Sequence, residues 1–377
     1  MDFIVYVIEK YYNQVMNQNS YVSSIANIRE SNAELLRIIC IVSILLHHFS
    51  LYGLYPEIFS PEIKLYGWDS HMLLLLHAFF YIGVNCFIFI SGWYGIKPKW
   101  KSFLNLYLIY GFYNFLPILK SILVVYWHGG GLQLPCSISY LLERTFMPFT
   151  HGYLWFMDCY LALFLIAPLL NVAIQYMDKK TYLYVLGLLT ILHVYFAYYG
   201  NMNLINAEGY SVTQFVYLYL IGAFLHRHLD GAFIDKHRQQ WLMGYIVCGI
   251  LWGGMAVLSV YNQSISTTVF HWNSLAYNNP LILLTAIFFF LFMMSWHFRS
   301  KLVNWLATST LAVYMMNEGV IKYSFLEPYA HRYSPLIQLG LFMGVTVAFY
   351  VFAIIVDKMR VLVQRPIWWC YDKWIRK

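Results

Sequence analysis

The sequence predicts an all-α fold, a polytopic membrane helix bundle of about ten transmembrane helices with both termini in the cytoplasm. Composition is the first reason, because hydrophobic residues make up 60% of the 377 residues and charged residues only 11%, with a mean hydropathy of +0.57. A soluble domain carries about a quarter charged residues. The second reason is that apolar runs of spanning length recur almost to the C-terminus.

The apolar runs define the expected helices in order. Each meets or approaches the length of about 20 residues that a transmembrane helix needs, and the sixth run is the shortest. The third and fourth runs are separated by the longest outer loop, 128–152, which could cover an outer cavity or simply follow the surface. The expected spans are 35–52, 72–93, 103–127, 153–176, 181–200, 212–226, 241–260, 278–296, 303–323 and 336–356.

The lysines and arginines predict the orientation, because short cytoplasmic loops carry an excess of them. With the N-terminus inside, most of the 24 lysines and arginines fall on the inner side, and the bias alternates correctly at every loop. This distribution accounts for the net charge of +7 without a nucleic-acid partner.

Three segments organise the chain. Residues 1–30 are expected to form a polar cytoplasmic or interfacial extension, 31–356 the ten-helix membrane domain, and 357–377 a basic cytoplasmic tail. Acidic Asp2 precedes the first short apolar run and Glu9 ends it early, so we expect no cleavable signal peptide. The six cysteines show no metal-ligand spacing, so we expect small core residues and no metal site.

The first span carries ionisable groups, which are costly inside a membrane and by default suggest function. Arg37 and His48 are eleven residues apart. At about 100° per residue they return to the same face of the helix, roughly 16 Å apart along its axis. One face therefore presents a fixed cation near the inner surface and a titratable base near the outer one. His47 points about 80° away from Arg37 and fits that face less well.

Other polar groups are expected at the depth of His48. They lie near the outer ends of the second, fourth and ninth spans, each roughly 6–10 Å below the outer surface. Because each would be costly facing lipid, we expect all of them to face a common interior. These residues are His77, Asp158, Asn317 and Glu318.

Each candidate also has a purely structural interpretation. Arg37 could reach the inner surface and pair with Glu34. His77 could be a satisfied structural histidine, and Asp158 could be a hydrogen-bond partner between helices. Glu318 could be solvated at the outer surface.

The inner half of the bundle has a different character. Lys97, Lys99 and Lys101 lie in the short loop after the second span, just beyond Ser91. They suit an anionic cytoplasmic ligand such as one that bears phosphates. Orientation alone would also explain them.

These features resemble membrane acyltransferase family 3, the integral-membrane O-acyltransferases that modify cell-surface and exported polysaccharides. The first span is similar to the family's opening signature, with the acidic, leucine-rich Glu34–Arg37 followed after ten residues by His48. The second span closes on Ser91–Trp93 after a phenylalanine-rich stretch, and 153–171 has the Trp-Phe, Tyr, Pro and Asn pattern of the family's fourth span. The resemblance covers residues 31–356.

The resemblance implies an O-acyltransferase, most commonly an O-acetyltransferase, in the inner or plasma membrane of a bacterium. It implies no bound cofactor, with acetyl-CoA as the cytoplasmic donor and a glycan or lipid-linked sugar as the acceptor. His48 would act as general base towards the acceptor hydroxyl, and Arg37 would contact the donor's phosphates or hold its entry site. The substrate-binding residues that we expect are Tyr314, Asn317, Glu318, Trp155, Asp158, Ser91 and His77.

One position departs from the family pattern. Members often carry Tyr-x-x-His in the ninth span, whereas here Tyr314 is followed by Asn317. Asparagine cannot accept a proton at neutral pH, but it can hydrogen-bond a carbonyl or a hydroxyl. The position can therefore orient a substrate but cannot serve as a base. The neighbouring Glu318 could compensate, although it points about 100° away.

Two other functions are compatible with the same polar groups. A transporter or flippase of glycans or small solutes would line its path with them, although no internal repeat and no paired Gly/Pro-broken helices support this. A catalytically lapsed family member with a binding role is the other alternative, and Asn317 is the reason to consider it.

Overall fold

The computed structural model describes residues 30–49, 68–129, 137–148, 154–199, 207–261, 276–319 and 335–375. Every regular element within these ranges is helical, which confirms the all-α prediction. Most of the proposed N-terminal extension and the middle of the loop at 128–152 lie outside the described residues. The part of that loop that is described contains a short helix, α6 (Ile138–Phe146).

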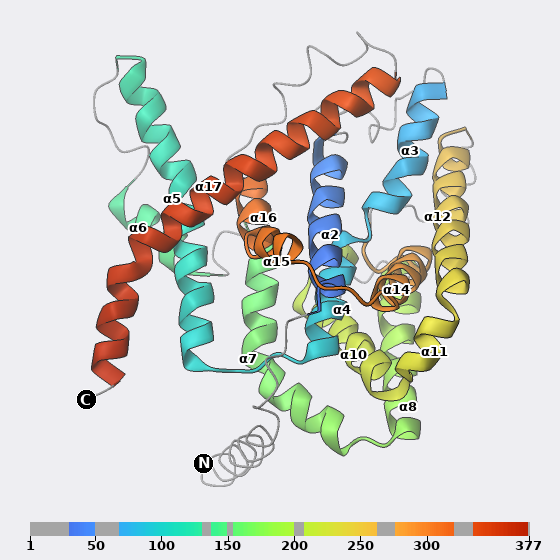
Figure 1. The fold of residues 1–377 in the computed structure, drawn as a ribbon. Coiled ribbons are helices and arrows are strands. Elements are labelled where there is room, and N and C mark those ends of the chain that lie inside the picture. The colour runs from blue at the N-terminus through green and yellow to red at the C-terminus, as the bar shows by residue number, and fades with distance from the viewer. Residues whose placement is uncertain are drawn as a thin grey trace.

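Every run predicted to span the membrane overlaps a helix (Figure 1). The ninth run is divided into two helices by a turn at 308–309, and the fifth run continues from an α-helix into a π-helix. Besides α6, the elements are α2 (Asn32–His48), α3 (Trp68–Phe80), α4 (Gly83–Tyr94), α5 (Trp100–Trp127), α7 (Trp155–Tyr176), α8 (Lys179–Thr190), the π-helix η3 (Ile191–Tyr199), the 3₁₀ turn η4 (Ala207–Gly209), α10 (Val212–His228), α11 (Gly231–Lys236), α12 (Arg238–Tyr261), α14 (Pro280–Met294), α15 (Lys301–Ala307), α16 (Thr310–Gly319) and α17 (Pro335–Ile375).

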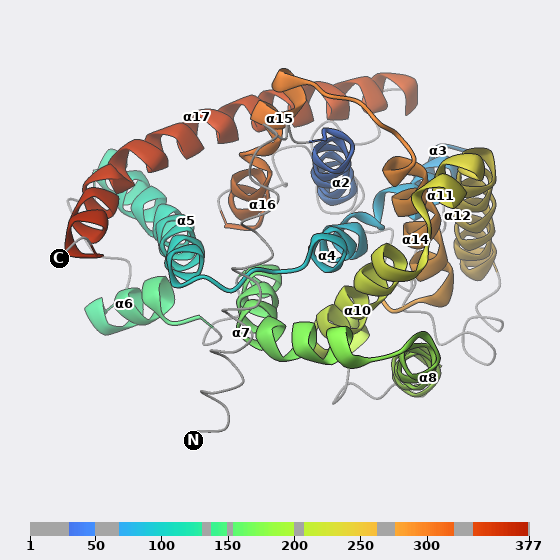
Figure 2. The ribbon, with the colours of Figure 1, turned by 60° about the horizontal axis from the view of Figure 1, so that its bottom comes forward.

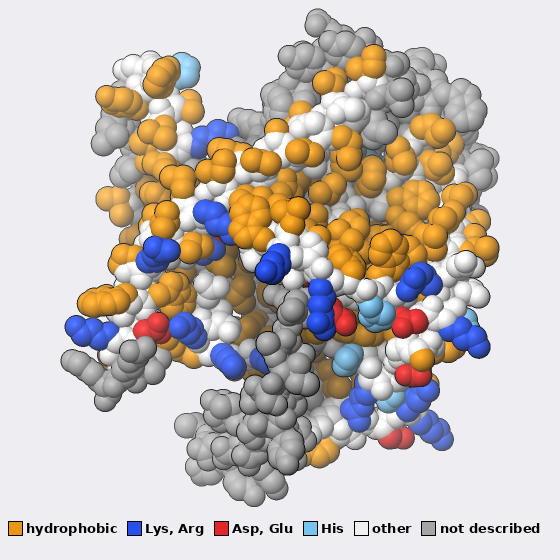
Figure 3. All heavy atoms as spheres, in the orientation of Figure 1, with side chains coloured by type: hydrophobic (Ala, Val, Ile, Leu, Met, Phe, Trp, Pro, Cys, Tyr) orange, Lys and Arg blue, Asp and Glu red, His pale blue; other side chains and the backbone are white. Residues whose placement is uncertain are grey.

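Among the described residues, 5 helices are long and apolar enough to cross a membrane. They are Leu75–Tyr94, Trp100–Trp127, Trp155–Tyr176, Arg238–Val257 and Gly340–Trp374. Figure 3 shows hydrophobic side chains over much of one face, with lysine and arginine side chains gathered towards its lower part. The chain is therefore a membrane protein, while the count of ten spans and the orientation of the termini stay predictions.

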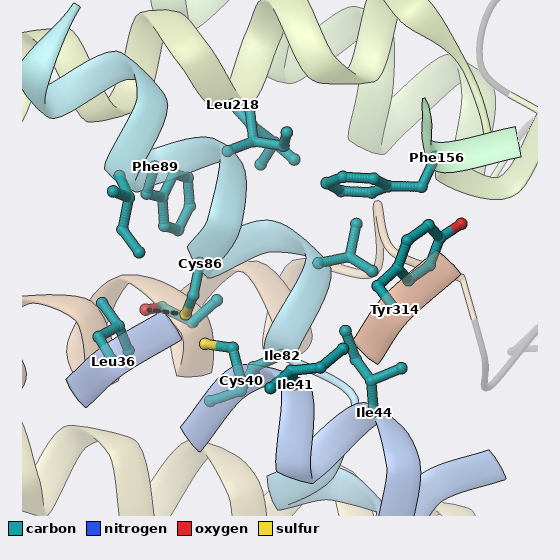
Figure 4. Close-up of a cluster of buried hydrophobic side chains, with 14 of the residues drawn as sticks. Leu36, Cys40, Ile41, Ile44, Ile82, Cys86, Phe89, Phe156, Leu218 and Tyr314 are labelled. Atoms are coloured by element: carbon teal, nitrogen blue, oxygen red, sulfur yellow. Dashed lines mark hydrogen bonds between the residues drawn. The ribbon is translucent and has the colours of Figure 1, made fainter. Parts of the chain in front are cut away.

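Helix α2 lies inside the bundle, in contact with α3, α4, α14, α15, α16 and α17 (Figure 2). Its apolar side chains Leu36, Cys40 and Ile41 pack against Ile82 and Cys86 at the start of α4 (Figure 4). These side chains are almost completely buried. Burial on several sides fixes the rotation of α2, which decides where its polar residues point.

Glycines allow α4 and α10 to pack closely. A Cβ added at Gly92 would overlap the backbone carbonyl of Tyr219, and one added at Gly222 would overlap that of Phe89. Small residues that let helix backbones approach are typical of membrane helix interfaces. The same packing holds Ser91, next to Gly92, against the interior.

A buried charged group ties the long C-terminal helix to its neighbours. The Asp357 carboxylate of α17 accepts hydrogen bonds from Tyr113 of α5 (3.2 Å) and from Ser309 (2.9 Å), just before α16. It also pairs with Arg360 at 2.8 Å. Helix α17 runs on to Ile375 and so includes most of the segment 357–377, while a basic cytoplasmic tail there stays a prediction.

Candidate active site

The last residue of α2 contacts α16 through a polar pair. The amide nitrogen Nδ2 of Asn317 lies 2.6 Å from Nδ1 of His48, although the two residues are far apart in sequence. Asn317 is completely buried, and His48 is nearly so. A hydrogen bond of this length fixes the imidazole against α16.

A carboxylate stands on the same side of the imidazole. Oε1 of Glu318 lies 3.8 Å from Nδ1 of His48. This distance is too long for a direct hydrogen bond but short enough for electrostatic attraction to a protonated imidazole. The Glu318 side chain is 21% exposed, so it stands at the edge of the buried pair.

The neighbouring histidine faces another direction. The His47 ring centroid lies 4.8 Å from that of His77 on α3 and 5.0 Å from that of Tyr81. His47 also lies beside His48, with centroids 5.3 Å apart. His77 is therefore joined to His48 through His47.

A cavity of about 170 Å³ lies between α2, α4, α5, α7 and α16. On α2 it is bounded by Arg37 and Ile44, and on α16 by Tyr314. Ile44 is about one helical turn before His48, so this part of the cavity wall lies close to the histidine. Its lining residues are Arg37, Ile44, Phe87, Ser91, Leu106, Phe156, Tyr160, Thr310, Leu311 and Tyr314.

The cavity is lined by one cation and by several aromatic rings. Arg37 pairs with the carboxylate of Glu34 and its side chain is 25% exposed, so it lines the cavity while already holding an ion partner. Tyr314 lies with its ring centroid 5.0 Å from that of Phe156 and with the two ring planes tilted by 57°, and Figure 4 shows the two side chains as neighbours. Ser91 adds a hydroxyl that interacts with Tyr160 at 3.5 Å.

Trp155 belongs to an aromatic cluster. Its ring lies 4.5 Å from that of Tyr210 and 5.6 Å from that of Tyr277. Tyr277 in turn stacks on Tyr81 at 4.4 Å. Because Tyr81 contacts His47, this cluster adjoins the histidine group.

The structure thus divides the predicted site residues. His48, Asn317 and Glu318 meet directly, while Arg37, Ser91 and Tyr314 line the cavity beneath them. Asp158 is buried on α7, where it interacts with Tyr110 of α5 and exerts an electrostatic effect on the cavity-lining Tyr314. The described residues hold no group of His, Cys, Asp and Glu that could bind a metal ion.

Of the lining residues, Arg37, Ser91 and Tyr314 were predicted from the sequence, and the others were not. Ile44 could have been found, because it is seven residues from Arg37 and on the same helical face. Tyr160 is likewise one turn after Phe156 on α7. Leu106 and Thr310 carry no such signal, because their helices meet α2 only in the folded bundle.

Comparison with known proteins identifies the class to which this helical membrane protein belongs. A family model described as "Acyltransferase domain" matches residues 31–356, most of the chain. The chain belongs to membrane acyltransferase family 3 and is a membrane acyltransferase. No curated protein and no solved structure matches the chain.

Proposed function

We propose that the protein is an O-acetyltransferase that moves an acetyl group from cytoplasmic acetyl-CoA to a hydroxyl of a cell-envelope glycan or lipid-linked sugar. The observation that carries this proposal is the cavity lined by Arg37 and by Ile44, with His48 one helical turn after Ile44 on the same helix. A cation in the cavity wall and a base one turn beyond it suit a donor with phosphates at one end and a reactive thioester at the other.

The lining of the cavity suits the arm of the donor. Phe87, Leu106 and Leu311 supply apolar surface for its methylene groups, while Ser91 and Thr310 supply hydroxyls for its amides. Arg37 would bind phosphate oxygens, because a guanidinium matches their geometry in a bidentate way.

His48 supplies the acid–base chemistry in this proposal. The acceptor hydroxyl gives its proton to His48 while its oxygen attacks the carbonyl carbon of the thioester. The tetrahedral intermediate then collapses, the carbon–sulfur bond breaks, and the CoA sulfur leaves with the proton taken back from His48. The products are an acetyl ester and CoA, and no metal is required for the balance.

The sides of the membrane follow from the predicted orientation. Arg37 lies towards the cytoplasm, where acetyl-CoA is made, and His48 lies towards the outside. The acceptor would therefore enter from the outer side of a bacterial inner or plasma membrane, past the aromatic cluster that includes Trp155. Aromatic side chains with polar tips suit a sugar, which has apolar and hydroxyl-bearing faces.

The proposal can be tested on cells. Base-labile acetyl esters on surface glycans are measured in a deletion strain that carries the wild-type gene, His48→Ala or the control His193→Ala at matched expression. His193 is equally suitable for truncation because it is buried, but it stacks on Tyr217 away from the cavity. The expected result is loss of the ester with His48→Ala alone.

The same strains separate the alternatives. A transporter or flippase would change the amount of a glycan outside the cell and leave its ester content per sugar unchanged. A lapsed enzyme would leave all glycans unchanged in the deletion strain. Either outcome would contradict acetyl transfer to a surface glycan.

A further inference from the structure

Both residues of α16 that approach His48 do so at the same ring nitrogen. Nδ2 of Asn317 is 2.6 Å from Nδ1, and Oε1 of Glu318 is 3.8 Å from that same atom. Helix α16 therefore holds the Nδ1 edge of the imidazole. The nitrogen on the opposite edge, Nε2, is the one directed away from α16.

The state of Nδ1 decides whether Nε2 can act as a base. A neutral imidazole carries one hydrogen, so Nε2 accepts a proton only when Nδ1 holds that hydrogen. In the structure the Asn317 amide donates to Nδ1, which places the ring hydrogen on Nε2. Turning the amide over brings its oxygen Oδ1 to the same place, where it accepts a hydrogen bond from Nδ1–H.

We propose that Asn317 is a positioning residue that holds His48 in the Nδ1–H form through its amide oxygen, so that Nε2 takes the proton of the acceptor hydroxyl. This inference rests on the proposed function for the identity of the reaction. It differs from a role in binding substrate, because Asn317 acts on His48 and is itself completely buried. The amide oxygen keeps its hydrogen bond when His48 becomes charged, since both ring nitrogens then donate.

Other groups around His48 are less suited to this task. Glu318 is too far for a direct hydrogen bond, at 3.8 Å. His47 and, beyond it, His77 and Tyr81 form a separate ring contact on the α3 side of α2. Of Asn317, Glu318 and His47, Asn317 is the one at hydrogen-bond distance from Nδ1.

The test compares Asn317→Asp, Asn317→Ala and Asn317→His with the control Asn114→Ala. Asn114 is also a buried amide, but its side chain bonds to the Tyr110 carbonyl within α5. Acetyl transfer by purified protein is measured from pH 5 to 9. The labelling of His48 by diethyl pyrocarbonate is followed by mass spectrometry over the same range, because it reports protonation of the ring without acyl transfer.

We expect Asn317→Asp to move the acidic limb of both profiles to higher pH by about one unit or more, because a carboxylate stabilises the charged imidazole. Asn317→Ala should lower kcat roughly 100-fold with the KM for the donor little changed, since the ring loses its fixed orientation. Asn317→His should keep much of the activity, because a second imidazole can accept from Nδ1–H. The control should leave both profiles in place.

Three results would overturn the inference: labelling and rate profiles that do not move in Asn317→Asp, a kcat in Asn317→Ala equal to wild type, or a His48 that no label reaches. If the labelling profile moves but wild-type protein transfers no acetyl group, the coupling of Asn317 to His48 stands and the proposed reaction fails. The two failures are therefore distinguishable.

Discussion

Replacing Arg37 by glutamine tests the cation that lines the cavity. A hydrogen bond between a charged group and its partner contributes about 1.5–3 kcal/mol. The Arg37 side chain is 25% exposed and is already paired with Glu34, so water and a competing carboxylate weaken its contact with a ligand. The lower value is therefore appropriate, and with 1.4 kcal/mol per factor of ten it corresponds to a rise of about tenfold in the KM for acetyl-CoA.

The assay is the initial rate of acetyl transfer at saturating acceptor, with the donor concentration varied. The matched control is Lys373→Gln, which removes an exposed cation of α17 that lies 5.0 Å from the ring centroid of Trp369. We expect the KM for acetyl-CoA to rise in Arg37→Gln and to stay in place in the control, with kcat changed little in both. An unchanged KM together with a lower kcat would show that Arg37 does not bind the donor.

Three further predictions concern the scaffold. Asp357→Ala should destabilise the protein by about 3–5 kcal/mol, because it leaves a buried arginine without its carboxylate; stability in detergent equal to wild type would refute this. Gly92→Ala should cost about 1–3 kcal/mol because its Cβ would meet a backbone carbonyl of α10, whereas Gly187→Ala, with open space around it, should cost nothing. Hydrogen bonds from the side chain and then the backbone of Thr181 lower the pKa of the exposed Asp178 carboxyl. The N-terminal cap that Asp178 forms on α8 is therefore complete above the ordinary aspartate pKa of about 4 and is lost as the pH falls through the lowered pKa. Amide exchange at the start of α8 should consequently rise in acid in the wild-type protein but not in Asp178→Asn.

The features that depend on a single helix could be predicted from the sequence. The spacing of Arg37 and His48 follows from the helical period, and the structure places Arg37 in the cavity and His48 one turn beyond Ile44. The family was likewise predictable, because its signature lies in this continuous segment. Local periodicity is thus sufficient to predict that the fold is helical and which residues of α2 share one face.

Contacts between helices that are far apart in the sequence were harder to predict. The pairing of His48 with Asn317 joins α2 to α16, and its position depends on how the whole bundle packs. The length of the last helix, which runs to Ile375, also depends on contacts between helices. Asp357 and Arg360 look like the start of a solvated tail in a hydropathy pattern, but in the fold they pair with each other and with Tyr113.

The measurement that most directly tests the account uses purified protein in vesicles, with acetyl-CoA labelled in its acetyl group and an isolated cell-envelope glycan as acceptor. The wild-type protein should form a base-labile labelled ester, and His48→Ala should reduce the rate by a factor of about 10²–10⁴, the range of general base catalysis. His193→Ala should transfer at the wild-type rate. Transfer by well-folded His48→Ala at the rate of wild type would contradict the assignment of His48 as the base.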